Sequence, residues 1–316
     1  MFSDKRLTEA YNNARVEYFD EKSRYIFFSD THRGDRSLSD EFTGNVNIYI
    51  YALEYYFNND YVYVEAGDGD ELWEHSSFKH IRFAHSDVFD IMKKFYDNNR
   101  LIMLYGNHNM YLKNKHYVTS HLYRFFDEYN EEYIELFNGI DPCEALVLKN
   151  KNTGQEILTV HGHQGDFMND QLWYLTMLTL RYFWRFIHIV GFQNPASPAK
   201  NFHKMHKIEK MYNKWIEKNM MMLICGHTHR PKFPKSHELP YFNTGCGIRA
   251  GWITGIEISE GKIMLVDWRV MPNKDGVLQI ERKIAFGPEL IENFDLKNHG
   301  FCRLNTAGRK YSQAAQ

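Results

Sequence analysis

The stretch YIFFSDTHRGD, residues 25–35, joins four apolar residues directly to a polar cluster, and this junction decides the fold. A short apolar run that ends in turn-forming residues predicts a strand buried on both faces. Asp30 and His32 follow that strand two positions apart. Alternate side chains of an extended segment point the same way, so this pair is placed to grip one metal ion.

The same junction of apolar run and polar cluster recurs four more times along the chain. Helical patterns lie between the early runs, and strands that alternate with helices predict an α/β core. Ligands of such sheets gather beyond the carboxyl ends of the strands, where all five clusters would lie. The further junctions are YVYVEA to GDGDELWE (61–74), LIMLY to GNHN (101–109), EILTV to HGHQGD (156–166) and MLIC to GHTHRP (222–231).

Asp, Asn and His side chains dominate these clusters. Each one alone is more often structural, since a lone histidine commonly donates one loop hydrogen bond and Asp68 would suit a simple Asp-Gly turn. Their order and shared position at strand ends favour a metal site. Nitrogen and oxygen donors suit Mn²⁺, Fe or Zn²⁺, and a set without thiolates disfavours a structural zinc finger. The seven candidates are Asp30, His32, Asp68, Asn107, His161, His227 and His229.

The five motifs D-X-H, G-D, G-N-H, H-G-H and G-H-X-H, in this order, resemble those of the calcineurin-like metallophosphoesterase superfamily. The resemblance runs from about residue 24 to 256 and includes NTGCG at 243–247. It implies an α/β fold, a β-sandwich flanked by helices, with an α-helical insertion between the fourth and fifth motifs. It also implies a hydrolase that cleaves a phosphoester or pyrophosphate bond with a metal-activated water.

The resemblance further implies two divalent cations, with Mn²⁺ the first choice and Fe or Zn²⁺ the alternatives. Asp68 would bridge them, and His108 would sit over the substrate phosphate to stabilise charge or protonate the leaving oxygen. No serine or cysteine nucleophile is needed, and His163 has no ligand role. The first cation would be held by Asp30, His32, Asp68 and His229, and the second by Asp68, Asn107, His161 and His227.

One position departs from the usual family pattern, which reads GNHD. This chain has Asn109 in place of the acidic residue. A carboxylate there would orient His108 and increase its basicity, as a carboxylate does behind a metal-bound imidazole. We therefore expect a less basic His108 and a weaker acid step.

Three residues are candidate substrate contacts. Arg33 and Arg249 could fork onto phosphate oxygens, and Trp73 offers a face to a base or an acyl chain. Solvated surface positions are the alternative for the two arginines. Packing beneath the loop is the alternative for Trp73.

Residues 167–219 form the predicted helical insertion, a lid candidate with an aromatic helix followed by a basic amphipathic helix. Arg181 and Arg185 lie one turn apart and could meet a substrate anion. The basic helix is compatible with peripheral contact to an anionic membrane or with a solvated lysine face on a packed helix. The insertion and GDGDELW are similar to the UDP-2,3-diacylglucosamine pyrophosphatase branch, but that branch normally has Arg at the position of His108.

Length and composition fit one metallophosphoesterase domain at 1–285 that includes the insertion, followed by a polar tail at 286–316. Four scattered cysteines and no apolar leader predict a cytoplasmic protein. A net charge of -2 gives no indication of nucleic-acid binding. The resemblance implies a phosphorylated small molecule or other phosphoester as the partner. A noncatalytic scaffold, a membrane-associated pyrophosphatase of a lipid-linked nucleotide and the oligomeric state stay open.

Overall fold

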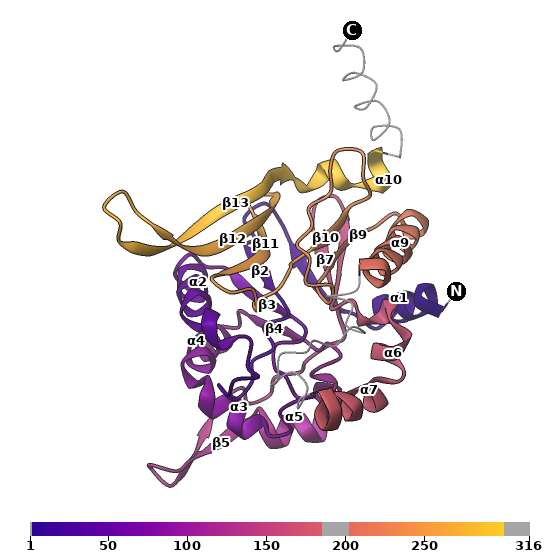
Figure 1. Ribbon diagram of the computed structural model, residues 1–316. Coiled ribbons are helices and arrows are strands. Elements are labelled where there is room, and N and C mark those ends of the chain that lie inside the picture. The colour runs from indigo at the N-terminus through magenta and orange to yellow at the C-terminus, as the bar shows by residue number, and fades with distance from the viewer. Residues whose placement is uncertain (1, 185–201, 300–316) are drawn as a thin grey trace.

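Two β-sheets pack face to face, with helices on their outer faces, in the computed structural model, which describes residues 2–184 and 202–299 (Figure 1). The larger sheet has the strand order β13-β12-β11-β2-β3-β4. Strands β2, β3 and β4 run parallel to one another, and β11 pairs with β2 antiparallel. The bounds are β2 Tyr25–Phe28, β3 Val62–Ala66, β4 Leu101–Leu104, β11 Trp252–Ser259, β12 Lys262–Pro272 and β13 Leu278–Leu290.

The second sheet has the order β1-β7-β8-β9-β10. Strands β8 and β9 are parallel, whereas β7 is antiparallel to β8. Because β8 and β9 both lead into motif loops, their carboxyl ends bring the fourth and fifth motifs together. The bounds are β1 Arg15–Phe19, β7 Ala145–Asn150, β8 Glu156–Val160, β9 Met222–Cys225 and β10 Tyr241–Asn243.

Apolar side chains from both sheets fill the space between them. Phe27 and Val64 of the larger sheet belong to the same buried cluster as Leu148 and Ile224 of the smaller one. The four-residue strands YIFF, LIML and MLIC are buried along their whole length, as expected for strands covered on both faces. The predicted α/β sandwich flanked by helices is therefore confirmed.

Helices cover the two outer faces. Helices α2 (Val46–Asn58) and α4 (Ser86–Asp97) pack on the larger sheet, and α1 (Phe2–Asn12) and α9 (Phe202–Asn219) on the smaller one (Figure 1). None of the helices within the described ranges is both long and apolar enough to cross a membrane. The shorter elements are α3 Phe78–Ala84, α5 Lys115–His121, α6 Phe167–Asp170, α7 Trp173–Thr179, α10 Leu296–His299, a π-helical turn at Leu180–Trp184 and the hairpin of β5 Arg124–Asp127 and β6 Glu132–Glu135.

The predicted insertion divides into two parts with different surroundings. In α9 the apolar face is buried, with Tyr212, Trp215 and Ile216 in the core of the smaller sheet, while Lys207 and Lys214 are exposed. The amphipathic pattern is thus confirmed. The alternative of a solvated lysine face on a packed helix therefore describes α9, because its apolar side chains are part of that core.

The predicted boundary between residues 285 and 286 falls inside β13, which continues to Leu290. The polar and glycine-containing sequence of this strand hides its pairing, because an edge strand needs little apolar sequence. The rest of the proposed domain division stays a prediction.

Candidate metal centre

The five motif loops meet at one edge of the sandwich, beyond the carboxyl ends of β2, β3, β4, β8 and β9. Asp30 and His32 do not lie on an extended segment as predicted, since their φ angles are 53° and 47°. Asp68, His227 and His229 also have positive φ. A left-handed backbone conformation is uncommon and strained at non-glycine residues. Such strain is typically found where a functional site requires it. Turns, rather than strand alternation, therefore aim these side chains.

Glycines beside these residues allow the loops to approach one another. A Cβ atom on Gly106 would overlap the carboxylate of Asp68, and one on Gly226 would overlap the carboxylate of Asp30. A Cβ atom on Gly67 would collide with the ring of His161, and Gly67 also has a φ of 91°. The second, third and fifth motifs thus need these glycines for close approach to a neighbouring motif.

Asp30, His32 and His229 form the first ligand group, whose donor atoms all lie within 4.8 Å of one another. The Nε2 atom of His229 is 3.1 Å from Oδ1 of Asp30 and 3.3 Å from Nε2 of His32. The three donor atoms therefore converge on one point, as the ligands of a single cation do.

Asp68, His161 and His227 form a second group within the same 4.8 Å limit. Oδ2 of Asp68 is 2.9 Å from Nε2 of His161. The other ring nitrogen of His161, Nδ1, lies 3.1 Å from the carbonyl oxygen of Ala66. Donation to that carbonyl fixes the tautomer and leaves Nε2 available as a ligand.

Three buried polar atoms of the candidate ligands have no hydrogen-bond partner among the described residues. They are Oδ1 of Asn107, Nε2 of His161 and Nε2 of His227. An unpaired buried donor or acceptor costs about 1–3 kcal/mol, so such atoms call for a partner of another kind. All three atoms are of the type that coordinates a divalent cation. The residues present therefore fit the metal that the motifs imply.

Asp68 lies between the groups. Its Oδ2 atom is 4.0 Å from Nε2 of His32 in the first group as well as close to His161 in the second. Its Oδ1 atom accepts a hydrogen bond from the backbone N–H of His108 at 2.8 Å. A carboxylate placed this way suits a bridge between two cations.

The charges of the site favour ionised carboxylates. Burial opposes ionisation of Asp30, but the neighbouring His229 and His161 outweigh it and hold its pKa well below the usual range. Burial likewise opposes ionisation of Asp68, yet His161 and His108 lower its pKa. Both groups would be available as anionic ligands at neutral pH.

His227 differs from the other three candidate histidine ligands, because burial lowers its pKa while nearby carboxylates overcome burial and raise the pKa of His32, His161 and His229. Burial by itself would lower the pKa of His229, but the carboxylate of Asp30 raises it to about 9. Burial lowers the pKa of His227, and the charge of His161 adds to that effect. His227 is thus neutral and ready to coordinate, whereas His229 must lose a proton first.

Glu71 is the residue that the sequence did not assign to the centre. Its Oε2 atom is 2.7 Å from Nδ1 of His32, and its Oε1 atom is 2.8 Å from Nδ1 of His108. One carboxylate therefore orients both a candidate ligand and the candidate acid. The available signal was its place three residues after Asp68 in GDGDE. That position does not tell whether the side chain orients the histidines or only lines the cleft.

Asn109 closes the GNHN turn, since its Oδ1 atom accepts the backbone N–H of Gly106 at 2.6 Å. The carboxylate that the motif lacks at position 109 is supplied by Glu71 instead. The weaker acid step expected from Asn109 stays a prediction.

Trp73 lies against the other face of this arrangement. Its ring stacks on His108 with centroids 4.1 Å apart, and it packs with Met177 and Leu180 of the insertion. The side chain is buried, so the packing alternative holds and a substrate-stacking role does not. Trp73 holds the imidazole of His108 in place.

Arg33 is not a substrate contact. It is fully buried, with Nε 2.8 Å from Asp70 and Nη1 2.6 Å from Glu65. Its neighbour His32 points into the site, but Arg33 points into the core. Arg249, by contrast, is exposed beside the first group and donates a 3.0 Å hydrogen bond to the carbonyl of His229.

Arg181 is also committed to a structural contact. Its Nε and Nη2 atoms donate to the carbonyl oxygens of Trp73 and Leu72 at 2.8 and 2.7 Å. The predicted meeting with a substrate anion is therefore wrong for these donors, and Arg185 lies outside the described residues. Arg181 connects the insertion to the loop that carries Glu71.

His163, left without a ligand role, is fully buried beside His161, with ring centroids 5.7 Å apart. Burial, reinforced by the charges of His161 and His227, holds its pKa well below the usual range. It is a neutral imidazole packed behind the second group. None of the candidate ligand groups within the described chain includes it.

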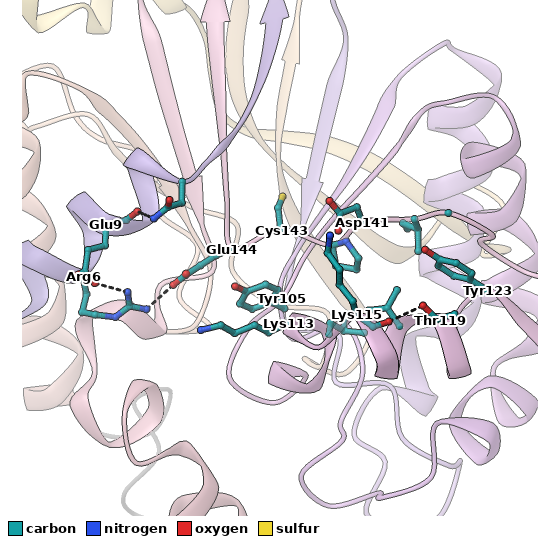
Figure 2. A pocket seen from close by; sticks show the side chains of 16 residues that line it. Arg6, Glu9, Tyr105, Lys113, Lys115, Thr119, Tyr123, Asp141, Cys143 and Glu144 are labelled. Carbon is teal, nitrogen blue, oxygen red and sulfur yellow. Dashed lines mark hydrogen bonds and ion pairs between the residues drawn. The ribbon is translucent and has the colours of Figure 1, made fainter.

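Helix α1, which the sequence did not predict, supports the centre from outside. Arg6 pairs with Asp170 at 2.8 Å and with Glu144 at 2.7 Å, and Glu144 accepts a hydrogen bond from Gln164 in the fourth motif loop. Figure 2 shows Arg6 and Glu144 on the wall of a hollow of about 780 Å³. No candidate ligand lines that hollow, so it is distinct from the metal centre.

Motifs, sheets and ligand geometry together resemble those of the calcineurin-like metallophosphoesterases. No protein-family model matches the sequence, and no curated protein matches it significantly. Vps29 of Chaetomium thermophilum is 8% identical over 85% of this chain and 100% of its own, with a TM-score of 0.35. A cold-active protein-tyrosine phosphatase of a Shewanella species is 12% identical over 85% and 83%, with a TM-score of 0.37.

A putative 5'-nucleotidase from Staphylococcus aureus is 12% identical over 90% of this chain and 58% of its own, with a TM-score of 0.33. Similarities this remote do not determine what the present chain does.

Proposed function

We propose that this protein is a dinuclear metal-dependent phosphoesterase. The observation that carries the proposal is the convergence of two ligand groups on Asp68, with His108 held beside them by Glu71. The donors are nitrogen and oxygen only, a set that suits Mn²⁺ first and Fe or Zn²⁺ as alternatives. Bound cations would supply a hydroxide nucleophile near neutral pH and would neutralise the phosphate oxygens.

Under this proposal each group of residues has one role. The first cation would be held by Asp30, His32, His229 and Asp68. The second would be held by Asp68, Asn107, His161 and His227. Glu71 and Trp73 fix the ring of His108 from two directions, at Nδ1 and across its face. The remaining nitrogen, Nε2, is then free to stabilise a phosphate oxygen or to give a proton to the leaving oxygen.

The substrate would be a phosphomonoester, a phosphodiester or a pyrophosphate. Arg249, at the exposed rim beside His229, is the residue on which we expect a distal phosphate or other anion to bind. The complete ligand set argues against a noncatalytic scaffold, because loss of function in such a fold would be expected to remove ligands.

A second candidate substrate class has its own support. Large apolar side chains gather on the exposed side of the first half of the insertion, next to the loop that bears Trp73. An amphiphilic substrate at a membrane surface, such as a lipid-linked nucleotide, would cover such side chains. The exposed residues are Phe167, Met168, Leu172, Tyr174 and Leu175.

The proposal is tested by metal analysis of the purified protein combined with a substrate screen. Bis-p-nitrophenyl phosphate, p-nitrophenyl phosphate and nucleoside-diphosphate esters would separate diesterase, monoesterase and pyrophosphatase activity. We expect up to two transition-metal ions per chain and loss of hydrolysis on chelation, restored by Mn²⁺. Turnover that persists without metal on every active substrate would overturn the proposal.

The membrane alternative is tested by flotation with anionic liposomes in the absence of substrate. We expect Leu172→Asp together with Leu175→Asp to abolish binding, because charges would replace exposed apolar contacts. Tyr18→Asp, an exposed apolar position on the remote strand β1, is the matched control. Equal flotation of both variants would mean that the insertion does not contact the membrane.

A further inference from the structure

Strand β13 forms an open edge of the larger sheet. It is 13 residues long, and within the described chain it pairs only with β12. With β12 it extends as a long ribbon away from the body of the molecule (Figure 1). A long, unpaired edge strand is a template for another strand, and proteins usually cover or shorten such edges.

Apolar side chains are exposed along this edge. Leu278, Ile284 and Phe286 have 69%, 44% and 57% of their surface accessible. Val277, in the turn that leads into the strand, is also exposed. A free strand that serves only as a solvated border would not need apolar residues at these positions.

The pairing of β12 with its two neighbours shows which residues of β13 direct their backbone N–H and C=O groups toward the open edge. The N–H of Val270 in β12 points to the carbonyl of Gly251 rather than to β13. Val270 stands opposite Ile280, so this pair is not a hydrogen-bonded pair of the β12–β13 ladder. By alternation, Ile280, Arg282 and Ile284 direct their backbone groups toward the open edge.

We propose that two copies of this chain associate through β13, paired antiparallel about a two-fold axis at Arg282. In that register Glu281 of each copy lies opposite Lys283 of the other, and Ile280 lies opposite Ile284. The backbone groups of residues 280, 282 and 284 form the new ladder. The interface is isologous and closes as a dimer, with one sheet continuous across both copies.

Charge selects this register over its neighbours. A shift of the axis to Glu281 or to Lys283 would set two like charges directly opposite one another, which is unfavourable across a strand pair. At the proposed axis the two Arg282 side chains are opposed, but each is already paired with Glu257 of its own chain at 2.7 and 3.0 Å. Only this axis opposes Glu to Lys twice.

Sedimentation velocity over a concentration series tests the association, with charge reversal as its probe. We expect a dimer whose dissociation constant rises about tenfold in Glu281→Lys and in Lys283→Glu, because each change converts two attractive pairs into two repulsive ones. The double variant Glu281→Lys/Lys283→Glu should restore the dimer. Thermal unfolding of each variant verifies that the monomer is unchanged.

Disulfide trapping tests the register. The two residues of a pair that is not hydrogen-bonded approach closely enough for a disulfide. A mixture of Glu281→Cys and Lys283→Cys proteins should cross-link under mild oxidation, whereas each variant alone and the unmodified protein should not. Cross-linking within Glu281→Cys alone would overturn the register.

The proposal as a whole fails if the purified chain is monomeric at every concentration, as it would be if this edge received a strand from a different protein. It also fails if the charge-swapped double variant dimerises no better than the single ones. None of these positions lies in the metal centre, so hydrolysis is not needed as a readout.

Discussion

The two ligand groups of the metal centre differ in how closed they are. In the first group the side chains of His32 and His229 are 10% and 18% exposed. In the second, those of His161 and His227 are 0% and 4% exposed. The first group therefore lies at the mouth of the site, next to exposed Arg249, and the second lies at its base.

The protonation of the groups differs in the same sense. Burial works against a charged His229, but Asp30 raises its pKa to about 9, whereas burial leaves His227 with a lowered pKa. Both histidines of the first group have a raised pKa, so a cation that enters it has to displace their protons. In the second group only His161 has a raised pKa, and His227 already presents neutral nitrogen. We infer that the second cation is held more firmly and that the first exchanges more readily.

The largest effect should come from the residue that the two groups share. Asp68→Asn removes the bridging charge and should release both cations, with a fall in kcat/KM of roughly 10³-fold or more. Metal content by mass spectrometry and hydrolysis of a chromogenic ester measure this. Asp275→Asn, in the exposed turn after β12, is the matched control and should change neither.

Asn109→Ala gives a contrast on the same loop. It removes one hydrogen bond to Gly106, a net contribution of about 1 kcal/mol, and leaves Glu71 in contact with His108. Activity should fall far less than in Asp68→Asn. If Asn109→Ala were the more damaging change, the bridging role of Asp68 would be refuted.

His108→Ala should separate chemistry from metal binding. Loss of a general acid typically costs roughly 10²- to 10³-fold in kcat, and neither ligand group contains His108 under our assignment. Both cations should therefore remain. A sharp drop in metal content would mean that His108 is a ligand, a reading compatible with its proximity to His32 and Glu71.

The pH dependence of metal binding should distinguish the groups. Because the metal-free pKa of His229 is raised from 6.5 to about 9 and that of His32 is raised as well, affinity at the first group should rise at least about tenfold per pH unit up to pH 9. The second group, in which only His161 has a raised pKa, should depend less on pH. Competition with a chelator across pH 6 to 10 measures both.

The stability of the metal-free protein should move in the opposite direction. A group whose pKa is raised on folding stabilises the protein fully below its unfolded value, and this contribution is lost as the pH passes about 9. Chemical denaturation of the chelated protein from pH 6 to 10 would show it. Constant affinity at the first group over this range would contradict the assignment of His229.

The sequence predicted the sandwich and the meeting of six of the seven candidate ligands, because apolar strands and polar loop clusters are local patterns with a known meeting point in space. It could not predict which way Arg33 points. Its position next to His32 suggests a site residue. The left-handed turn, however, directs the Arg33 side chain into the core toward Glu65 and Asp70.

The partnership of Glu71 with His108 was equally hidden, because it joins residues 37 positions apart across two loops. The surroundings of the helical segment were hidden for another reason. An amphipathic pattern records that one face of α9 is buried but not what it is buried against, and here it is the core of the smaller sheet.

The smallest predicted effect concerns the link between the insertion and the mouth of the site. Arg181→Gln should remove at least one of the bonds to Leu72 and Trp73 and loosen the loop that positions Glu71, and through it His32 and His108. Because the donors and ligands themselves stay in place, we expect a few-fold fall in kcat and weaker binding at the first group only. Arg36→Gln, whose side chain pairs with exposed Asp87, removes a comparable charge without touching that loop and should leave both unchanged. Equal loss of the two cations in Arg181→Gln would instead mean that the insertion supports the base of the site as much as its mouth, and the contrast between the groups would not extend to their surroundings.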